Sequence, residues 1–205
     1  MKHRVGTVIV FLTVLASAQF LQAAPLKETP YYPMAVGSEW DYKLTAGGRV
    51  QILTIKVTKH VMLNGVMCAQ LETFRNGMSL AAEFLNVKGD GVYRLKTASF
   101  EAKPPVRILK LPVKNNDSWK IDSTTANQKI KGTYTLTQEK MKVPAGEYKN
   151  AAVIKSPNLS VGPMTWNYSA AYVKGVGLIY QKIVVGGRTL LIQELKEYRP
   201  AKKTK

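Results

Sequence analysis

The sequence contains few side chains of the types that carry out covalent or acid–base chemistry. It has two histidines, and only one of them, His60, lies beyond the first few residues. A histidine that acts as a general base needs an orienting acid and a nucleophile close to it. The residues around His60 suggest neither, and we therefore expect a surface histidine.

The single cysteine, Cys68, lies in an apolar, strand-like segment over 66–69. A reactive thiol needs cationic neighbours or a helix N-terminus to lower its pKa, and no helix is predicted there. We expect a buried, unreactive thiol. One cysteine also excludes an internal disulfide, and the shortage of Cys and His excludes a Cys/His zinc site.

The 13 Asp and Glu residues are scattered along the chain. A glycosidase needs two carboxylates that face one cleft, and the closest pairs are Asp117 with Asp122 and Glu194 with Glu197. Residues three apart on a strand face opposite sides, which disfavours the second pair, and Asp117 borders a turn of the kind that Asp stabilises. Phosphate-loop, Gly-x-Ser-x-Gly and His-Glu-x-x-His motifs are absent. We predict no catalytic residues, no metal site, no cofactor and no enzymatic activity.

The chain is strongly basic, with 30 Lys and Arg against 13 acidic residues and a net charge of +17. Nucleic-acid binding would favour Arg and exposed aromatic residues on one face, and Arg is sparse, so we expect no nucleic-acid partner. A soluble basic surface, on which part of the lysines protect sheet edges from aggregation, is the interpretation we prefer. If the charge serves a partner, an anionic envelope surface, such as phospholipid headgroups or cell-wall polymers, is the most available one.

The N-terminus has the three parts of a secretory signal peptide. Basic residues precede an apolar run over 5–15, and small residues follow at Ala18, Ala23 and Ala24, each a candidate cleavage site. That run is shorter than the ~20 residues that span a bilayer. We predict a cleaved signal peptide over 1–24, one β-rich domain over 25–200 and a disordered basic tail over 201–205. The mature protein is expected to be soluble and monomeric, in the periplasm or outside the cell.

Short alternating segments separated by turn residues predict antiparallel β structure. Apolar and charged residues alternate over 39–45, which is the period of a half-buried strand. Asn64-Gly65 and Asn76-Gly77 are two-residue hairpin signals. Pro104-Pro105 is expected to interrupt the strand pattern, and the polar turn over 114–117 leads to Trp119 without a predicted strand.

These segments predict an all-β fold, namely a strongly curved antiparallel sheet or half-open barrel of about ten strands, with little helix beyond the signal peptide. The segment 78–85 is the best candidate for a helix, but it lies between two turns and is predicted as a strand. Gly175-Val176-Gly177 is followed by a strand-like segment rather than a helix, so we expect a bulge or bend there and no dinucleotide site.

Aromatic residues alternate into the predicted strands. Most of them should fill the core, but a barrel of about ten strands often leaves room for an apolar ligand. The candidate ligand-binding residues are Trp40, Tyr42, Trp119, Tyr134, Trp166 and Tyr168.

Three segments carry a resemblance to a known family. The segment 32–42 (YPMAVGSEWDY), the segment 143–150 (VPAGEYKN) and the segment 172–179 (YVKGVGLI) occur in this order, followed by Leu195 and Tyr198. Together they resemble the TapB-like domain, a family of uncharacterised exported bacterial proteins. The resemblance covers most of the mature chain and implies an exported, β-rich domain without assigned catalytic residues. The expected architecture is also similar to LolA-like periplasmic lipoprotein carriers, which says little about function.

The sequence leaves three functional hypotheses. The first is an exported, non-enzymatic binding or carrier domain that holds an apolar or amphiphilic ligand in the concave face of the sheet. The second is an envelope-associated structural or interaction protein with a filled core and no ligand cavity. The third, a hydrolase, would require His60 or the acidic residues to converge in a cleft.

Overall fold

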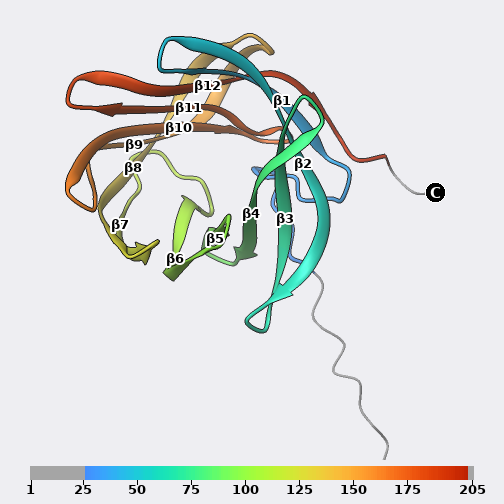
Figure 1. Cartoon of the computed structure of the whole chain (residues 1–205), viewed down its shortest axis with the longest axis horizontal. Coiled ribbons are helices and arrows are strands. Elements are labelled where there is room, and N and C mark those ends of the chain that lie inside the picture. The colour runs from blue at the N-terminus through green and yellow to red at the C-terminus, as the bar shows by residue number, and fades with distance from the viewer. Residues whose placement is uncertain (1–25, 203–205) are drawn as a thin grey trace, which may run out of the picture.

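The computed structural model describes residues 26–202, which form twelve strands and no helix (Figure 1). The predicted signal peptide and residues 203–205 of the predicted tail lie outside the described residues, and residues 201 and 202 belong to no strand. No helix in the described range is long and apolar enough to cross a membrane. The strands are β1 (Glu39–Ala46), β2 (Arg49–Leu63), β3 (Val66–Arg75), β4 (Met78–Lys88), β5 (Gly91–Thr97), β6 (Phe100–Lys110), β7 (Ser118–Thr125), β8 (Gln128–Val143), β9 (Gly146–Val161), β10 (Met164–Val173), β11 (Gly177–Val185) and β12 (Arg188–Arg199).

Each strand pairs in antiparallel fashion with the next one in the chain, and β1 also pairs with β12, which closes a barrel. Figure 1 shows β1 beside β12. The predicted all-β, antiparallel fold is confirmed. The barrel is closed and has twelve strands, however, rather than half-open with about ten. Alternation predicts each hairpin, but closure depends on the twist accumulated over the whole sheet, which no single segment reveals.

Two segments differ from the predicted strand pattern, and the first of them adds a strand. The polar turn before Trp119 is followed by the full strand β7, which turns Trp119, Ile121 and Ser123 to the interior. β6 begins at Phe100 and runs through the two prolines that are expected to interrupt the pattern. Other local predictions are confirmed, because the segment 78–85 lies in strand β4 and the Asn-Gly hairpins form turns with positive φ.

The seam between β6 and β7 is the weakest backbone pairing of the barrel. The two strands pair at one position, Lys103 with Thr124. Proline has no N–H to donate, and consecutive residues of a strand direct their N–H groups to opposite sides. Pro104 and Pro105 therefore remove one donor toward each neighbouring strand.

Two side chains join β6 to β7 where the backbone ladder is missing. The Ser123 hydroxyl donates to the Pro104 carbonyl at 2.6 Å, and the Trp119 indole N–H donates to the Arg107 carbonyl at 2.9 Å. Ser123 and Trp119 are both buried, and both bonds are partly buried. Trp119 is thus a structural residue of the seam.

The segment that precedes β1 closes one end of the barrel. Its Met34 and Tyr32 side chains are buried, and the Tyr32 ring lies 6.1 Å from Trp40 and 6.0 Å from Tyr172. The Trp40 indole N–H donates to the carbonyl of Val176 in the β10–β11 turn at 2.6 Å. These contacts cover this end of the barrel, which we call the closed end.

Two neighbouring glycines provide a test of the β4–β5 turn. A Cβ atom at Gly91 would lie 2.5 Å from the Leu109 carbonyl oxygen and 2.7 Å from the Arg107 side chain, whereas one at Gly89 would meet nothing within 4 Å. Because backbone would have to move, Gly91→Ala is expected to lower the free energy of unfolding by about 1–3 kcal/mol. Gly89→Ala is the matched control and should change it by less than ~0.5 kcal/mol. Urea titration followed by tryptophan fluorescence measures both, and equal stability of the two variants would contradict the close packing of β5 on β6.

Candidate ligand-binding cavity

The interior of the barrel contains two neighbouring cavities. The larger, which we call the aromatic cavity, has a volume of about 290 Å³, and the smaller, the inner cavity, about 150 Å³. Arg94 and Gln181 line both cavities. The aromatic cavity is lined by Arg94, Thr97, Phe100, Ala102, Val106, Thr125, Gln128, Ile130, Tyr134, Leu159, Val161, Trp166, Tyr168, Gln181 and Ile183. The inner cavity is lined by Tyr32, Ile55, Leu71, Thr73, Glu83, Arg94, Ile108, Tyr172, Leu178, Gln181 and Gln193.

The two cavities occupy different positions along the barrel. Tyr32 and Tyr172, which belong to the aromatic cluster of the closed end, border the inner cavity. Residues beside the β5–β6 and β7–β8 turns, such as Phe100 and Gln128, border the aromatic cavity. The aromatic cavity therefore reaches the opposite end of the barrel from the N-terminal segment.

An ion pair lies between the two cavities. Arg94 Nε donates to Glu83 Oε2 at 2.8 Å. In the register of β3, β4 and β5, Glu83 pairs with the buried Leu71, and Arg94 pairs with the buried Leu85. Paired residues face the same side of a sheet, so both charged side chains point into the barrel.

The guanidinium of Arg94 has donors that face the cavities. Its side chain keeps 31% of its accessible surface and that of Glu83 keeps 24%, and because both residues line the interior cavities, this surface faces internal space. Among the residues that the structure describes, the only hydrogen bond of the Arg94 side chain is the one from Nε to Glu83. Its terminal nitrogens are available to a hydrogen-bond acceptor in the cavity.

Arg94 is cationic at every physiological pH. Burial alone would lower the pKa of Arg94, but Glu83 and the nearby Tyr168 and Tyr172 raise it above its usual value. A charge in such a place is costly unless it is paired. Glu83 supplies that pairing through the hydrogen bond from Arg94 Nε.

Aromatic rings form one wall of the aromatic cavity. Tyr134 and Tyr168 are stacked with ring centroids 5.4 Å apart, and Trp119 meets Tyr134 edge-on at 5.6 Å. Burial raises the pKa values of Tyr134 and Tyr168, which keeps both phenols neutral. The indole N–H of Trp166 is buried without a hydrogen-bond partner in the described part of the chain. This wall offers flat apolar surface with polar groups at its edges.

The six candidate residues separate into two groups. Tyr134, Trp166 and Tyr168 line the aromatic cavity. Trp40 and Tyr42 instead pack at the closed end, where Trp40 stacks on Tyr198 at 5.3 Å.

The remaining candidates have structural hydrogen bonds. The Tyr42 hydroxyl donates to the Leu178 carbonyl at 2.7 Å, and Trp119 holds the β6–β7 seam. None of Trp40, Tyr42 and Trp119 lines the aromatic cavity or the inner cavity.

Glu83 and Arg94 are absent from the sequence-based candidates. Alternation assigns each of them to the apolar face of its strand. Glu83 shares a face of β4 with Ala81 and Leu85, and Arg94 shares a face of β5 with Val92. A charged residue in the apolar phase of a strand is the signal that would have identified them. A register shift between Phe84 and Leu85 obscures it.

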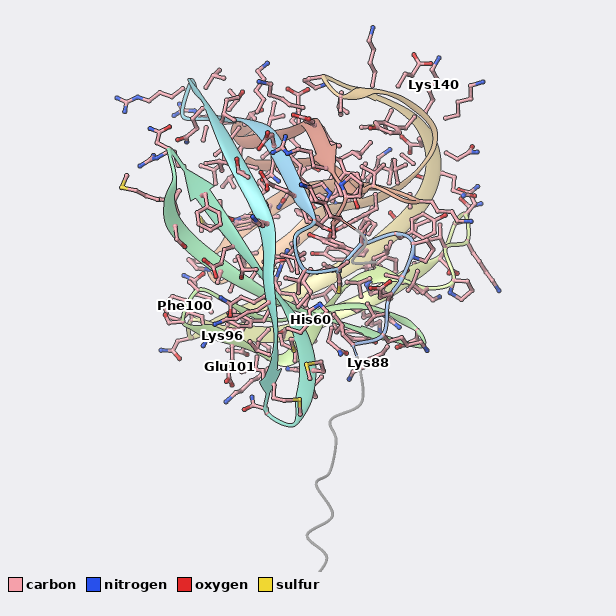
Figure 2. All side chains as sticks on the ribbon, turned by 90° about the vertical axis from the view of Figure 1, so that its right-hand side faces the viewer. His60, Lys88, Lys96, Phe100, Glu101 and Lys140 are labelled. Atoms are coloured by element: carbon pink, nitrogen blue, oxygen red, sulfur yellow. The ribbon has the colours of Figure 1, made fainter. Side chains whose placement is uncertain are left out.

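The groups considered for catalysis lie apart. His60 is exposed, as predicted, with Nε2 2.7 Å from the Met34 carbonyl oxygen, and Figure 2 labels its position. Cys68 is buried, as predicted, and burial raises the pKa of its thiol to about 11. Asp117 pairs with Lys110, and Asp122 pairs with Lys131.

The acids near the C-terminus are also paired. Glu194 lies 3.7 Å from Lys43, and Glu197 lies 2.5 Å from Arg199. Within residues 26–202, no group of three or more His, Cys, Asp or Glu side chains is placed to hold a metal ion.

Two solved structures are similar to this barrel. A candidate lipoprotein from Parabacteroides distasonis ATCC 8503 matches with a TM-score of 0.52 and 12% identity, over 82% of this chain and 98% of that one. A candidate exported protein with a YmcC-like fold from Bacteroides fragilis NCTC 9343 matches with a TM-score of 0.49 and 13% identity, over the same shares. No family model and no curated protein sequence matches the chain. The first similarity shows a shared fold over nearly all of that protein.

The interior ion pair gives a prediction for stability. Arg94→Met leaves Glu83 as an unpaired carboxylate inside the barrel and is expected to lower the free energy of unfolding by about 3 kcal/mol. Arg94→Met with Glu83→Leu removes both charges and should recover at least half of that loss. Lys131→Gln is the control, because its partner Asp122 is 3.6 Å away and both are exposed, and it should cost less than ~1 kcal/mol. Urea titration measures all three, and an Arg94→Met effect no larger than the control would contradict the interior placement of the pair.

Proposed function

We propose that this protein is an exported, non-enzymatic binding or carrier domain that holds an apolar or amphiphilic small molecule inside its barrel. The observation that carries the proposal is the aromatic cavity of about 290 Å³, with Tyr134, Trp166 and Tyr168 in its wall and Arg94 at its inner end. Natively folded interiors are close-packed and rarely keep such space without a use.

The cavity favours a ligand with one apolar part and one hydrogen-bond acceptor. The acyl chain or ring system would lie against Tyr134, Trp166 and Tyr168, and the acceptor would receive hydrogen bonds from the terminal nitrogens of Arg94. Sites for small molecules usually have volumes of ~300–1,000 Å³. The volume of the aromatic cavity is near the lower limit, so it suits a single chain or ring rather than a lipid with several chains.

Export and family membership are part of the same proposal. The N-terminal sequence pattern supports secretion, and a structure with a shared fold belongs to a candidate lipoprotein. The three TapB-like segments support membership of that exported family. The absence of an enzymatic activity is proposed because Glu83, which is paired with Arg94, is the one acidic residue among the described residues that line the two cavities, and His60 lines neither.

The second hypothesis, a structural or interaction protein, requires a filled core. The closed end is filled in this way, with Trp40 and Tyr42 fully packed. The aromatic cavity at the other end supports ligand binding over that alternative.

A dansyl-labelled undecanoic acid tests the proposal directly. Its fluorescence shifts to the blue when the dansyl group enters an apolar environment, and we expect saturable binding that unlabelled decanoate displaces. Ala102→Phe adds a ring inside the aromatic cavity, because Ala102 is buried and lines it. We expect this variant to bind the probe at least tenfold more weakly, since the added ring occupies the space of the chain.

Thr133→Phe is the matched control. Thr133 is exposed on β8, beside the cavity residue Tyr134 but on the opposite face of the strand, and its variant should bind as the wild type does. Circular dichroism establishes that each variant is folded before binding is measured. Absence of saturable binding by the wild type, or equal affinity of Ala102→Phe and wild type, would contradict the proposal.

A further inference from the structure

The barrel exposes apolar side chains mainly at one end. In an up-and-down barrel the turns alternate between the two ends, so the β1–β2, β3–β4, β5–β6, β7–β8, β9–β10 and β11–β12 turns lie at the end opposite the N-terminal segment. We call this end the hairpin rim. Nine large hydrophobic side chains of the described residues are strongly exposed, and seven of them lie within four residues of these turns: Val50, Ile52, Met78, Leu80, Phe100, Met164 and Leu190.

This distribution differs from that of an ordinary surface. Exposed apolar residues that occur singly are normal, but here five of the six rim turns carry at least one, and they surround the end that the aromatic cavity reaches. Gathered apolar side chains usually mark a surface that contacts another apolar phase. In Figure 2, Phe100 lies on the opposite side of the molecule from Lys140.

Basic residues accompany the apolar ones on the rim. Arg49, Arg75, Lys96, Lys129 and Arg188 lie within three residues of the rim turns, against a single acidic residue, Glu101. None of the five forms an ion pair with another described residue. Glu101 is already engaged by Lys103 at 3.3 Å. The rim therefore presents unpaired positive charge together with apolar side chains.

We propose that the hairpin rim docks on the surface of a lipid bilayer that contains anionic phospholipid. Apolar side chains such as Met78 and Leu190 would enter the interface between headgroups and acyl chains, and arginines such as Arg49 and Arg188 would contact the phosphates. A bilayer with anionic phospholipid offers an apolar phase and negative charge along a continuous plane, which matches the apolar and basic side chains spread over the turns of the rim. Docking places the aromatic cavity next to the membrane, and it does not require that the cavity hold a ligand.

Flotation with vesicles tests the docking. The protein is purified from its cell envelope, with its N-terminus defined by intact mass, and mixed with vesicles of phosphatidylglycerol and phosphatidylcholine in equal amounts or of phosphatidylcholine alone. We expect binding to the anionic vesicles that is at least tenfold stronger than binding to the neutral ones. Arg49→Gln with Arg188→Gln should reduce binding to the anionic vesicles at least tenfold. Lys114→Gln with Lys174→Gln is the charge-matched control at the closed end, where both residues are exposed, and it should have less than a twofold effect.

The apolar contribution has its own control. Met78→Ser with Leu190→Ser alters two rim residues that are 61% and 52% exposed, and Val36→Ser alters a residue that is 50% exposed in the segment before β1, at the closed end. Only the rim substitutions should weaken binding to the anionic vesicles. None of these three residues lines either cavity, so probe binding in the absence of vesicles should be unchanged. The ligand proposal and the docking proposal can therefore fail separately.

Three results would overturn the docking. The wild type would fail to bind anionic vesicles, or the rim and closed-end charge pairs would weaken binding equally, which would indicate a general effect of net charge. Alternatively, analytical ultracentrifugation would show a dimer that Met78→Ser with Leu190→Ser dissociates, with no vesicle binding. That result would make the rim an interface between two copies of the chain.

Discussion

The pairing of β1 with β12 is the constraint on which the rest of the structure depends. Without it, the chain is an antiparallel meander with two faces. With it, one face of every strand becomes an interior, and side chains from strands far apart in sequence meet there. Trp40 on β1 and Val176 beyond β10 are joined in this way. The filled closed end, the cavities and the rim are all consequences of the ring.

The interior differs along the length of the barrel: side chains pack at the closed end, and the aromatic cavity lies toward the other end. At the closed end, the N-terminal segment and the aromatic cluster around Trp40 leave no large void. At the other end, stacked rings such as Tyr134 and Tyr168 form one wall of the aromatic cavity. Arg94 stands at the boundary, and its pairing with Glu83 makes a buried charge tolerable while its terminal donors face empty space. This division leaves two cavities inside the barrel instead of a solid core.

The sequence predicts local structure well and long-range closure poorly. Alternation over 39–45 and the Asn-Gly turns depend on neighbouring residues, and the structure confirms them. Closure depends on contacts across the barrel, which alternation does not encode. Strand β7 does alternate, with Trp119 and Ile121 buried between Lys120 and Asp122, but it is short and follows a polar turn. The candidate site likewise contains residues that the sequence predicts and one that it does not. Tyr134, Trp166 and Tyr168 belong to strongly alternating segments and line the cavity, whereas Arg94 is a charged residue in the apolar phase of β5, two residues after the buried Val92.

Native mass spectrometry of the protein, purified without detergent from its own cell envelope, tests the central claim most directly. The account predicts a protein that carries additional mass, one small amphiphile for each chain, which organic extraction removes and fragmentation identifies as a molecule with one acyl chain or ring system and an acceptor group. A bare protein mass, combined with no uptake of such amphiphiles added in excess, would contradict the claim that the barrel is a container for a ligand.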